Sequence, residues 1–468
     1  MNSKTGRQKR FLGVTVLGDF ILNEGIDPVL ENVIGRAGAT AVAVNPTVTA
    51  PSKEGEGSFQ PPPDAGSSPR LFDRPLWGKP ALWVRSAPSF RPNLGYYAHT
   101  PYAPRQSDDL TDIHGPLIRV FIRAARRRGL KVYLQLGAAS PPLLREEDTP
   151  RLPDGRIPDR MADTGSLAAP AIREYNRAYV HDLLDHYPEI NGLRPDWPEY
   201  PCYKLDEAFQ DFGPAVKRWT EDKCFDFEGI QRSVAELYRR VHGGQNDRDL
   251  LHIGSPARGV FSIVSALRHE PRLMEWLKLK AALSVDILEH WRSTLNEYGG
   301  ADKELSPNAF MPPFTLLTGF DFDTAGDICA AVSPKLYTMH WSVMIQFWAE
   351  TLLASNAGLS EHCVVRALAS LFDLADENTA ERISDYGYPE PNELHPIPTC
   401  VLRRKIEQAL AQANGKTAIT PLVHGYGPLE DFSRRLQVVA DSAVDGAWIN
   451  RYGYLSDQKL DAVGQIWH

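Results

Sequence analysis

Strand-like and helix-like segments alternate along almost the whole chain, and this alternation limits the possible folds more than any other feature. Short apolar runs are followed, in most cases, by longer stretches in which apolar residues recur with helical spacing. Parallel strands need crossover connections, which helices supply, so the pattern predicts a parallel sheet. We expect eight strands, at residues 11–20, 39–49, 130–137, 190–197, 308–318, 331–341, 417–426 and 446–454.

Eight strands separated by helices favour an α/β fold, a (β/α)8 TIM barrel with long strand-to-helix loop insertions. A barrel of this kind needs about 250 residues, and the chain has 468. We therefore expect one barrel domain over residues 1–468, with insertions at about 50–110, 200–225 and 243–307. The largest insertions are expected after strands two, four and five. A doubly wound open sheet is the alternative, but no G-x-G-x-x-G motif follows any predicted strand.

Charge and composition restrict the partners and the compartment of the protein. The net charge of −8 argues against nucleic acid as the main partner, because phosphate binding favours a basic surface. No stretch approaches the roughly 20 apolar residues of a membrane helix, so no membrane partner is expected. The first apolar segment is interrupted by Thr15, Gly18 and Asp19, which indicates a strand rather than a signal peptide. Five scattered cysteines without C-x-x-C spacing indicate reduced thiols, and we expect a cytoplasmic location.

Polar side chains follow every predicted strand. In a (β/α)8 barrel the functional residues lie at the carboxyl ends of the strands. Any one of these polar residues could be a buried core group or a helix cap, but eight polar strand ends together indicate a site. The candidates are Asp19, Asn45, Gln135, Arg194, Asp196, Trp197, Glu199, Asp321, Tyr337, His340, Trp341, His424, Tyr426, Asn450, Arg451 and Tyr452.

The fourth predicted strand carries the densest group of candidates. Alternation places Gly192, Arg194 and Asp196 on one face of this strand. A buried strand does not normally carry an arginine and a carboxylate on one face unless they are paired or functional. Two carboxylates close to a tryptophan at a strand end suggest sugar chemistry. The structural alternative is an ion pair between Arg194 and Asp196, with Glu199 as a solvated loop residue.

The segment Gly-Leu-Arg-Pro-Asp-Trp-Pro-Glu-Tyr-Pro that begins at Gly192 resembles the strand-four signature of the family 18 glycoside hydrolases, the chitinase-like barrels. Their pattern is D-G-x-D-x-D-x-E, in which the final Glu is the general acid and the preceding Asp holds the acetamido group of the substrate. Here Asn191 and Arg194 replace the earlier acids, and Pro198 adds a residue before Glu199, which disfavours that substrate-assisted mechanism. The broader resemblance is to TIM-barrel glycoside hydrolases, in which a Glu after strand four is a recurrent acid/base.

The resemblance and the residues together predict a glycoside hydrolase that cleaves an oligosaccharide or glycoside by carboxylate acid/base catalysis. Glu199 is the expected general acid, because its aromatic, proline-bounded setting desolvates the carboxylate and raises its pKa toward neutrality. Asp196 is the favoured second carboxylate, and Asp321 is the next. We expect the other candidates to bind substrate, with Trp341, Trp448 and Tyr452 stacking on pyranose rings.

Two alternatives remain open at the level of the sequence. His340 and His424 could join acids around a divalent metal in a metal-assisted sugar isomerase, epimerase or lyase, although no H-x-x-x-H or H-x-H spacing supports a metal. A non-catalytic carbohydrate-binding barrel would keep the aromatic residues without a paired carboxylate. The prediction is a small-molecule carbohydrate partner, no metal and no cofactor. The sugar, the stereochemistry and the oligomeric state are not determined by the sequence.

Overall fold

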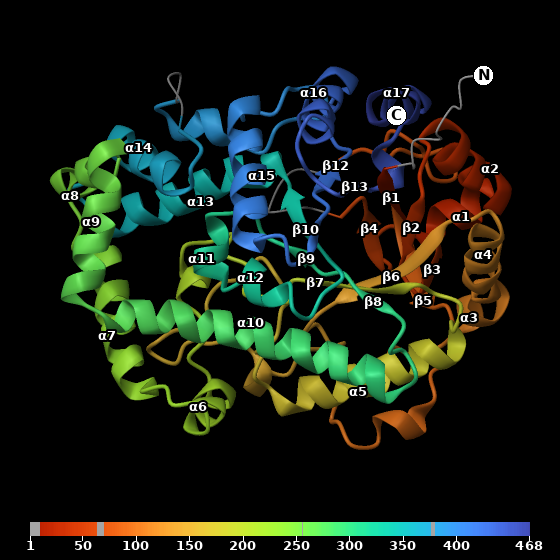
Figure 1. Cartoon of the computed structure of the whole chain (residues 1–468), viewed down its shortest axis with the longest axis horizontal. Coiled ribbons are helices and arrows are strands. Elements are labelled where there is room, and N and C mark those ends of the chain that lie inside the picture. Colours follow the sequence, from red (N-terminus) through yellow and green to blue (C-terminus); the bar gives the residue numbers. More distant parts are fainter. Residues whose placement is uncertain (1–9, 63–69, 255, 376–379) are drawn as a thin grey trace, which may run out of the picture.

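The computed structural model is a closed barrel of parallel strands surrounded by helices (Figure 1), which confirms the predicted fold class. It describes residues 10–62, 70–254, 256–375 and 380–468. The strands follow one another around the barrel in chain order, and the first pairs with the last. Their bounds are β1 (Phe11–Val16), β2 (Ala41–Val44), β6 (Lys131–Gly137), β7 (Gly192–Asp196), β8 (Glu304–Leu305) with β9 (Asn308–Ala309), β10 (Ala331–Leu336), β11 (Ala418–Ile419) with β12 (Leu422–His424), and β13 (Gly446–Asn450).

The interior of the barrel is filled by side chains that point inward at alternate positions along the strands. Trp448 on β13 lies at its centre and packs edge-on against Tyr133 of β6, with the ring centroids 5.4 Å apart. The guanidinium carbon of Arg194 lies 3.8 Å from the centroid of the Trp448 ring. Gly13 on β1 makes room for this ring, since a Cβ there would lie 2.2 Å from a Trp448 ring atom. At this level the barrel is therefore a packed core and not a pore.

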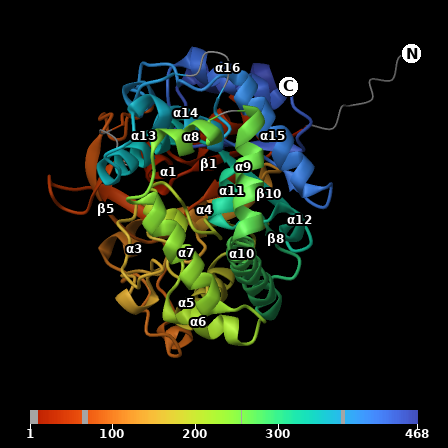
Figure 2. The same cartoon turned by 90° about the vertical axis from the view of Figure 1, so that its left-hand side faces the viewer.

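Helices cover the outside of the barrel and bury their apolar faces against it (Figures 1 and 2). In α4, for example, Ile118, Phe121 and Ile122 are buried, while the arginines at positions 123, 126 and 127 are exposed. The helices are α1 (Gly18–Glu24), α2 (Ile26–Glu31), α3 (Asp109–His114), α4 (Pro116–Arg127), α5 (Pro170–His186), α6 (Pro214–Glu221), α7 (Phe227–Val241), α8 (Asp247–Ile253), α9 (Pro256–His269), α10 (Arg272–Glu297), α11 (Phe314–Thr318), α12 (Phe322–Ala325), α13 (Thr338–Ser355), α14 (Glu361–Leu371), α15 (Thr399–Ala413), α16 (Leu429–Ala440) and α17 (Asp457–Trp467). Short 3-10 or π turns are η1 (Asn32–Arg36), η2 (Leu94–Tyr97), η3 (Glu146–Asp148), η4 (Asp206–Phe209), η5 (Ile383–Tyr386) and η6 (Tyr452–Tyr454).

Long insertions interrupt the barrel after three of its strands. The connection from β2 to β6 contains an antiparallel sheet of β3 (Thr47–Pro51), β5 (Leu82–Pro88) and β4 (Ser58–Gln60). The connection from β7 to β8 contains α6 to α10, which extend along one side of the molecule (Figure 2). The third long insertion follows the sixth barrel strand, β10, rather than the fifth. The prediction of a large insertion after strand five was wrong, because β9 ends at Ala309 and β10 already begins at Ala331. Most of the predicted insertion 243–307 belongs to the connection from β7 to β8.

Four strands end earlier than predicted because a helix begins where the apolar run continues. The predicted strands 11–20, 308–318, 331–341 and 446–454 give way to α1, α11, α13 and η6. A buried strand and a buried helix are both apolar on most sides, so periodicity could not separate them. As a result, Asp19, His340 and Trp341 lie on helices, and Tyr452 lies in a 3-10 turn.

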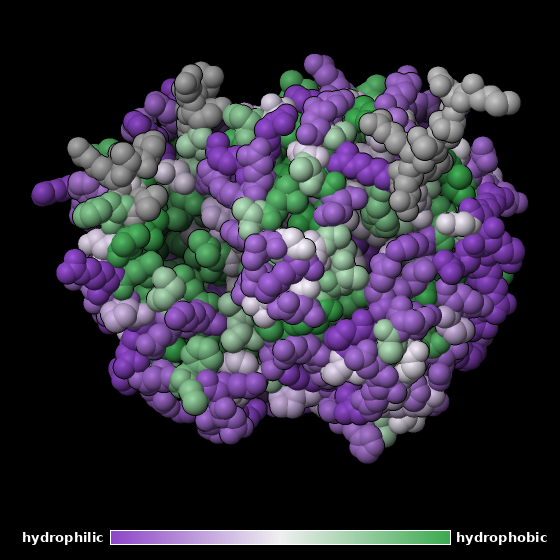
Figure 3. Space-filling model, in the orientation of Figure 1, coloured by the Kyte–Doolittle hydropathy of each residue, from purple (hydrophilic) through white to green (hydrophobic). Residues whose placement is uncertain are grey.

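A separate apolar surface lies on the helical insertion after β7. Leu237 of α7, Ile263 of α9 and Leu368 of α14 line a cavity of about 750 Å³ there. Figure 3 shows apolar side chains gathered around a hollow on this side of the molecule. None of the predicted site residues lines the cavity. In the part of the chain that the structure describes, no helix is long and apolar enough to cross a membrane.

Candidate active site at the barrel mouth

The site is built around an ion pair between the fourth and sixth barrel strands. Nζ of Lys335 on β10 lies 2.7 Å from Oδ1 of Asp196, at the end of β7. β9 lies between these strands, and its Asn308 is the register partner of both Asp196 and Ser333. Lys335 is two residues beyond Ser333 and faces the same way, so its long side chain crosses β9 to reach Asp196. The pair therefore lies at the carboxyl ends of the strands, where a substrate can approach.

The two members of the pair differ in exposure. The side chain of Lys335 is 5% exposed, whereas that of Asp196 is 26% exposed. The lysine ammonium also lies 4.2 Å from the centroid of the Trp197 ring. The Asp196 carboxylate is thus accessible from solvent while its negative charge is balanced by a buried cation beside an aromatic face.

Arg194 lies deeper in the barrel than Asp196 and has different partners. Its guanidinium donates to the Oγ atoms of Ser306 and Ser333, at 3.1 and 3.2 Å, and to the side-chain oxygen of Asn308. Burial among these neutral groups lowers the pKa of Arg194 to about 9. Asp196 is therefore paired with Lys335. The ion pair between Asp196 and Arg194, which was the structural alternative for this strand, is not formed.

A cluster of tyrosine and histidine rings surrounds the ion pair. Tyr203 follows β7, Tyr337 and His340 follow β10, and His424 ends β12. The Tyr203 hydroxyl lies 3.1 Å from Nδ1 of His340. The Tyr337 ring makes edge contacts with both histidines, with centroids 5.1 Å from His340 and 4.9 Å from His424. Asn450, at the end of β13, donates from Nδ2 to the Tyr337 hydroxyl over 2.6 Å. Residues from four strand ends therefore meet in one mouth.

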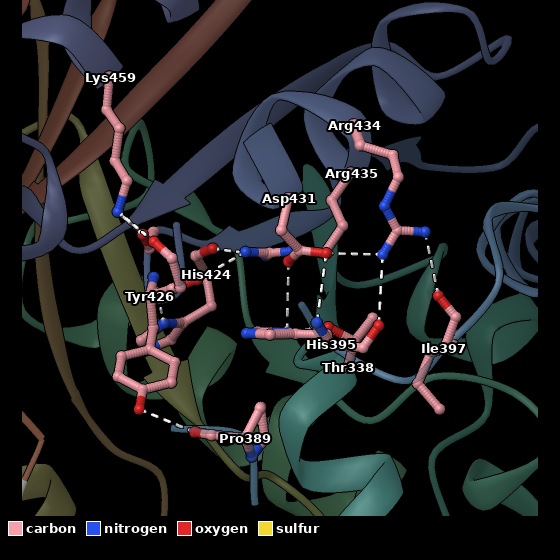
Figure 4. Close-up of polar contacts among 12 residues, drawn as sticks. Thr338, Pro389, His395, Ile397, His424, Tyr426, Asp431, Arg434, Arg435 and Lys459 are labelled. Atoms are coloured by element: carbon pink, nitrogen blue, oxygen red, sulfur yellow. Dashed lines mark hydrogen bonds and ion pairs between the residues drawn. The ribbon is translucent and has the colours of Figure 1, made fainter. Parts of the chain in front are cut away.

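A buried polar network holds the backbone around His424 (Figure 4). Arg435 of α16 donates to the carbonyl oxygens of His424 and Tyr426, at 2.7 and 2.6 Å. Asp431 accepts from Nε of Arg435 at 2.7 Å, and both side chains are fully buried. Lys459 donates to the carbonyl oxygens of residues 425, 427 and 454. This network fixes the end of β12 and with it the position of the His424 ring.

Glu199 lies beneath the mouth and has no exposed surface. Its Oε1 accepts from the Phe310 amide at 2.6 Å, and its Oε2 accepts from the Thr318 hydroxyl. Burial raises the pKa of Glu199 to about 7, and these two hydrogen bonds oppose the rise. The predicted direction of this pKa shift is confirmed, but the carboxyl group is enclosed and does not open onto the mouth. Its role as general acid stays a prediction.

A second buried carboxylate lies between the first and last barrel strands. Asp19 is in the first turn of α1, and its Oδ1 accepts from the Phe20 amide at 2.9 Å. Burial raises the pKa of Asp19 to about 6, while this hydrogen bond and the charge of Arg451 lower it. Arg451 follows β13 directly, so these two candidates are neighbours at the barrel's closing seam.

Several predicted site residues lie away from the mouth. Asp321 caps α12, where its carboxylate accepts from the amides of residues 323 and 324. Asp323 of the same helix pairs with Lys416, which precedes β11, so α12 lies near the amino ends of the strands. Trp341 packs against Phe314 in the helical layer. The predicted place of Asp321 at the carboxyl end of a strand was wrong, because the fifth strand ends at Ala309. Trp341 directly follows His340 on α13, and its ring is buried in the helical layer.

Two further predicted residues face other parts of the structure. The Tyr452 hydroxyl donates to Glu24 at 2.7 Å and accepts from Asn32, so this ring lies among α1 and η1. The Tyr426 hydroxyl donates to the Pro389 carbonyl at 2.9 Å, behind the His424 ring. Neither hydroxyl is directed at the Asp196–Lys335 pair.

Three residues of the mouth were not predicted from the sequence: Lys335, Tyr203 and Tyr454. The ring centroids of Tyr454 and His424 lie 5.1 Å apart. Lys335 could have been found, because a lysine in a buried strand, two residues before Tyr337, shares the inward face with it. Tyr203 and Tyr454 lie outside regular strands, and no periodic signal marks them. Among the described residues no three His, Cys, Asp or Glu side chains are grouped as a metal site would require.

Comparisons with solved structures found several chains that are similar to this one along most of its length. The catalytic domain of beta-amylase from Paenibacillus polymyxa is similar over 96% of this chain and 94% of its own, with 9% identity and a TM-score of 0.47. The Ostrinia furnacalis Group IV chitinase is similar over 98% of this chain and 99% of its own, with 8% identity and a TM-score of 0.43. The C-terminal domain of a putative chitinase from Desulfitobacterium hafniense is similar over 98% of this chain and 100% of its own, with 9% identity and a TM-score of 0.41. No family model and no curated protein matches the sequence.

Proposed function

We propose that this protein is a glycoside hydrolase in which the Asp196 carboxylate acts on the substrate at the barrel mouth. The observation that carries the proposal is the setting of this carboxylate. It is partly exposed at a strand end, its charge is balanced by Lys335, and the Trp197 ring lies against the same ammonium group. An accessible carboxylate beside an aromatic face suits a pyranose ring, whose apolar face packs on aromatic side chains.

Hydrolysis of a glycosidic bond needs a carboxylate in this position. The bond between the anomeric carbon and the bridging oxygen breaks, the bridging oxygen takes a proton, and the hydroxyl of a water molecule joins the anomeric carbon. Positive charge develops at the anomeric carbon in the transition state. In the proposal the Asp196 carboxylate stabilises this charge, either as the nucleophile or as the base that activates water.

Glu199 is the proposed proton donor. With a pKa of about 7 it carries its proton in a substantial share of molecules at neutral pH, as a general acid must. Because Thr318 and the Phe310 amide occupy its oxygens, Glu199 has to turn away from Thr318 to reach a leaving oxygen. The proposal therefore assigns the contact with the sugar ring to Asp196 and the proton to Glu199.

The remaining polar groups at the strand ends are proposed to bind sugar hydroxyls. They come from different strand ends, so they can surround a ring from several sides. The proposed substrate-binding residues are Asn45, Gln135, Lys335, Tyr337, His340, His424, Asn450 and Arg451. A carbohydrate partner and a cytoplasmic location belong to the same proposal.

Substitution of the carboxylates tests this function. The purified protein is assayed against a panel of aryl glycosides and oligosaccharides, and the substrate found is used for the variants. Asp196→Asn should lower kcat by roughly 10²–10⁴-fold, the usual loss when a positioned catalytic group is removed. Asp321→Asn is the matched control, because Asp321 caps a helix near the other end of the barrel, and it should keep the rate. Proton NMR of the first product then shows whether the anomeric configuration is retained.

Other outcomes would contradict the proposal in distinct ways. One such outcome is that the wild type turns over no substrate of the panel, while both wild type and Asp196→Asn bind sugar. This outcome would indicate a carbohydrate-binding barrel. Turnover that is abolished by a chelator and restored by a divalent metal, but insensitive to Asp196→Asn, would indicate the metal-assisted class.

A further inference from the structure

A second polar cleft adjoins the mouth, and we propose that it binds the anionic sugar residue of an acidic glycan. This inference rests on the proposed function, because it names the class of substrate for the same site. The cleft has a volume of about 690 Å³, within the range of small-molecule sites. Asn45, Gln135 and Gly137, at the carboxyl ends of the second and third barrel strands, form its inner edge.

The cleft begins one strand away from the reactive carboxylate. Gly137 of β6 is the register partner of Asp196, and the Ala138 amide donates to the Asp196 carbonyl at 2.8 Å. Gly137 also lines the cleft. A glycan whose scissile bond lies at Asp196 would therefore place an adjoining sugar residue in the cleft.

The walls of the cleft are preformed. Six prolines line it, and their fixed backbone angles limit motion of the loops that carry them. The Tyr175 and Tyr179 rings of α5 stack with centroids 5.7 Å apart and form part of the lining. A rigid wall with aromatic faces lowers the entropy cost of binding a sugar ring.

Two buried acceptors at the inner edge have no hydrogen-bond partner. They are Oδ1 of Asn45 and Oε1 of Gln135. The Asn45 amide nitrogen donates to the Gln135 carbonyl at 3.1 Å, which fixes the orientation of that side chain. Buried polar atoms are nearly always hydrogen-bonded, so an unpaired acceptor calls for a donor from a ligand. Sugar hydroxyls are donors of this kind.

The charged groups on the lining favour an anion. Arg105 and Arg160 are the cations of the lining, and Asp163 is its acid. Arg160 donates to the Thr164 carbonyl at 2.6 Å. Among the described residues Arg105 makes no ion pair or side-chain hydrogen bond, and it is exposed. An uncommitted guanidinium binds a carboxylate, sulfate or phosphate in a bidentate manner.

Arg105 also lies beside the stacked tyrosines. Burial raises the pKa of Tyr175, and the positive charge of Arg105 opposes that rise, as it does for Tyr179. Neither hydroxyl donates to a described residue, so both are available to the ligand. The cleft therefore combines a guanidinium, two phenolic hydroxyls, two amide oxygens and a stacking face around one volume.

Binding of matched sugars to the full chain tests the inference without any catalytic readout. The probes are neutral and uronic acid pairs, namely glucose with glucuronate, galactose with galacturonate and mannose with mannuronate, together with glucose 6-sulfate and glucose 6-phosphate. Affinities are measured by NMR titration of wild type, Arg105→Gln and Arg127→Gln. Arg127 is the matched control, because it is exposed at the end of α4, on the outside of the barrel.

At least one anionic sugar should bind about 10-fold more tightly than its neutral partner, and Arg105→Gln should remove that difference while Arg127→Gln keeps it. Preference for a uronate, a sulfate or a phosphate ester identifies the anion, and each of these results supports the inference. Equal affinity within every pair, or inorganic phosphate bound as tightly as any sugar, would overturn it. Since binding is measured apart from turnover, anion selectivity in a protein that cleaves nothing would reject the hydrolase proposal and keep this one.

Discussion

Lys335 and Asp196 form an ion pair of 2.7 Å that joins the sixth barrel strand to the fourth across the fifth. The lysine is nearly buried, whereas a quarter of the aspartate side chain is exposed. The pair thus combines a fixed cation with a carboxylate that a ligand can contact. This combination sets the mouth apart from the enclosed carboxylates Glu199 and Asp19.

The coupling within this pair is measurable. A double-mutant cycle of Asp196→Asn and Lys335→Met, measured by urea unfolding, should give a coupling free energy of about 1 kcal/mol. This value is at or above the upper end of the range for exposed ion pairs, because Lys335 is buried. The same cycle on the exposed pair of Arg91 and Asp112 serves as the control and should give a smaller value. A coupling near zero for Asp196 and Lys335 would contradict the pairing.

The stability of the protein should depend on pH through Glu199. Burial raises the pKa of this carboxyl from 4.5 to about 7 in the folded state. Between pH 4.5 and pH 7 the unfolded chain has lost this proton, whereas the folded protein still holds it. The free energy of unfolding therefore falls as pH rises from 4.5 to 7 and stays reduced above pH 7. The full difference corresponds to about 3 kcal/mol.

Glu199→Gln isolates this effect. Urea unfolding at pH 5 and pH 8 should show a smaller loss of stability for the variant than for wild type, because the amide does not ionise. Glu407→Gln, an exposed change on α15, should behave like wild type. An identical loss in wild type and Glu199→Gln would show that the Glu199 pKa is not raised.

The network behind His424 should be sensitive to the loss of one charge. Asp431→Asn removes the negative charge that faces the buried guanidinium of Arg435, and breaking a buried pair in this way costs about 3–5 kcal/mol. Asp441→Asn, at the C-cap of the same helix, removes only an exposed charge that accepts a hydrogen bond from Gln437. Urea unfolding of the two variants checks the prediction, and equal stability would argue against the network.

The barrel core should not tolerate a methyl group at Gly13. Gly13→Ala would place a Cβ 2.2 Å from the Trp448 ring, and overpacking of this kind costs about 1–3 kcal/mol. In Gly243→Ala the nearest atoms lie 4.0 Å from the new Cβ, so this control should be close to neutral. Thermal unfolding distinguishes the two, and a neutral Gly13→Ala would mean that the Trp448 ring moves aside.

Much of the fold could be predicted because each barrel strand carries its own local signal. The helix α5 is an example, because Pro170 marks its start in the sequence and apolar spacing indicates its length. Strand ends were less predictable. At Asp19 and His340 the chain turns into a helix without losing its apolar character, so only packing decides where the strand stops.

In the candidate site, too, some residues could be predicted from the sequence and others could not. Tyr337, His340, His424 and Asn450 were predicted from strand ends, and the structure brings them together. Asp321 was predicted by the same rule and lies elsewhere, because the strand before it ends at Ala309. The rule therefore succeeds where the strand boundary is right and fails where it is wrong.

The order of apolar runs and helical stretches by itself determined the barrel and the segments that supply its mouth, because hydrophobic periodicity is a local property of the chain. Only the tertiary structure decided that Asp196 pairs with Lys335 rather than Arg194, and that Glu199 is enclosed by Phe310 and Thr318. These partners lie more than a hundred residues apart. Their contact depends on strand register and side-chain reach across the barrel, and no local pattern records either of them.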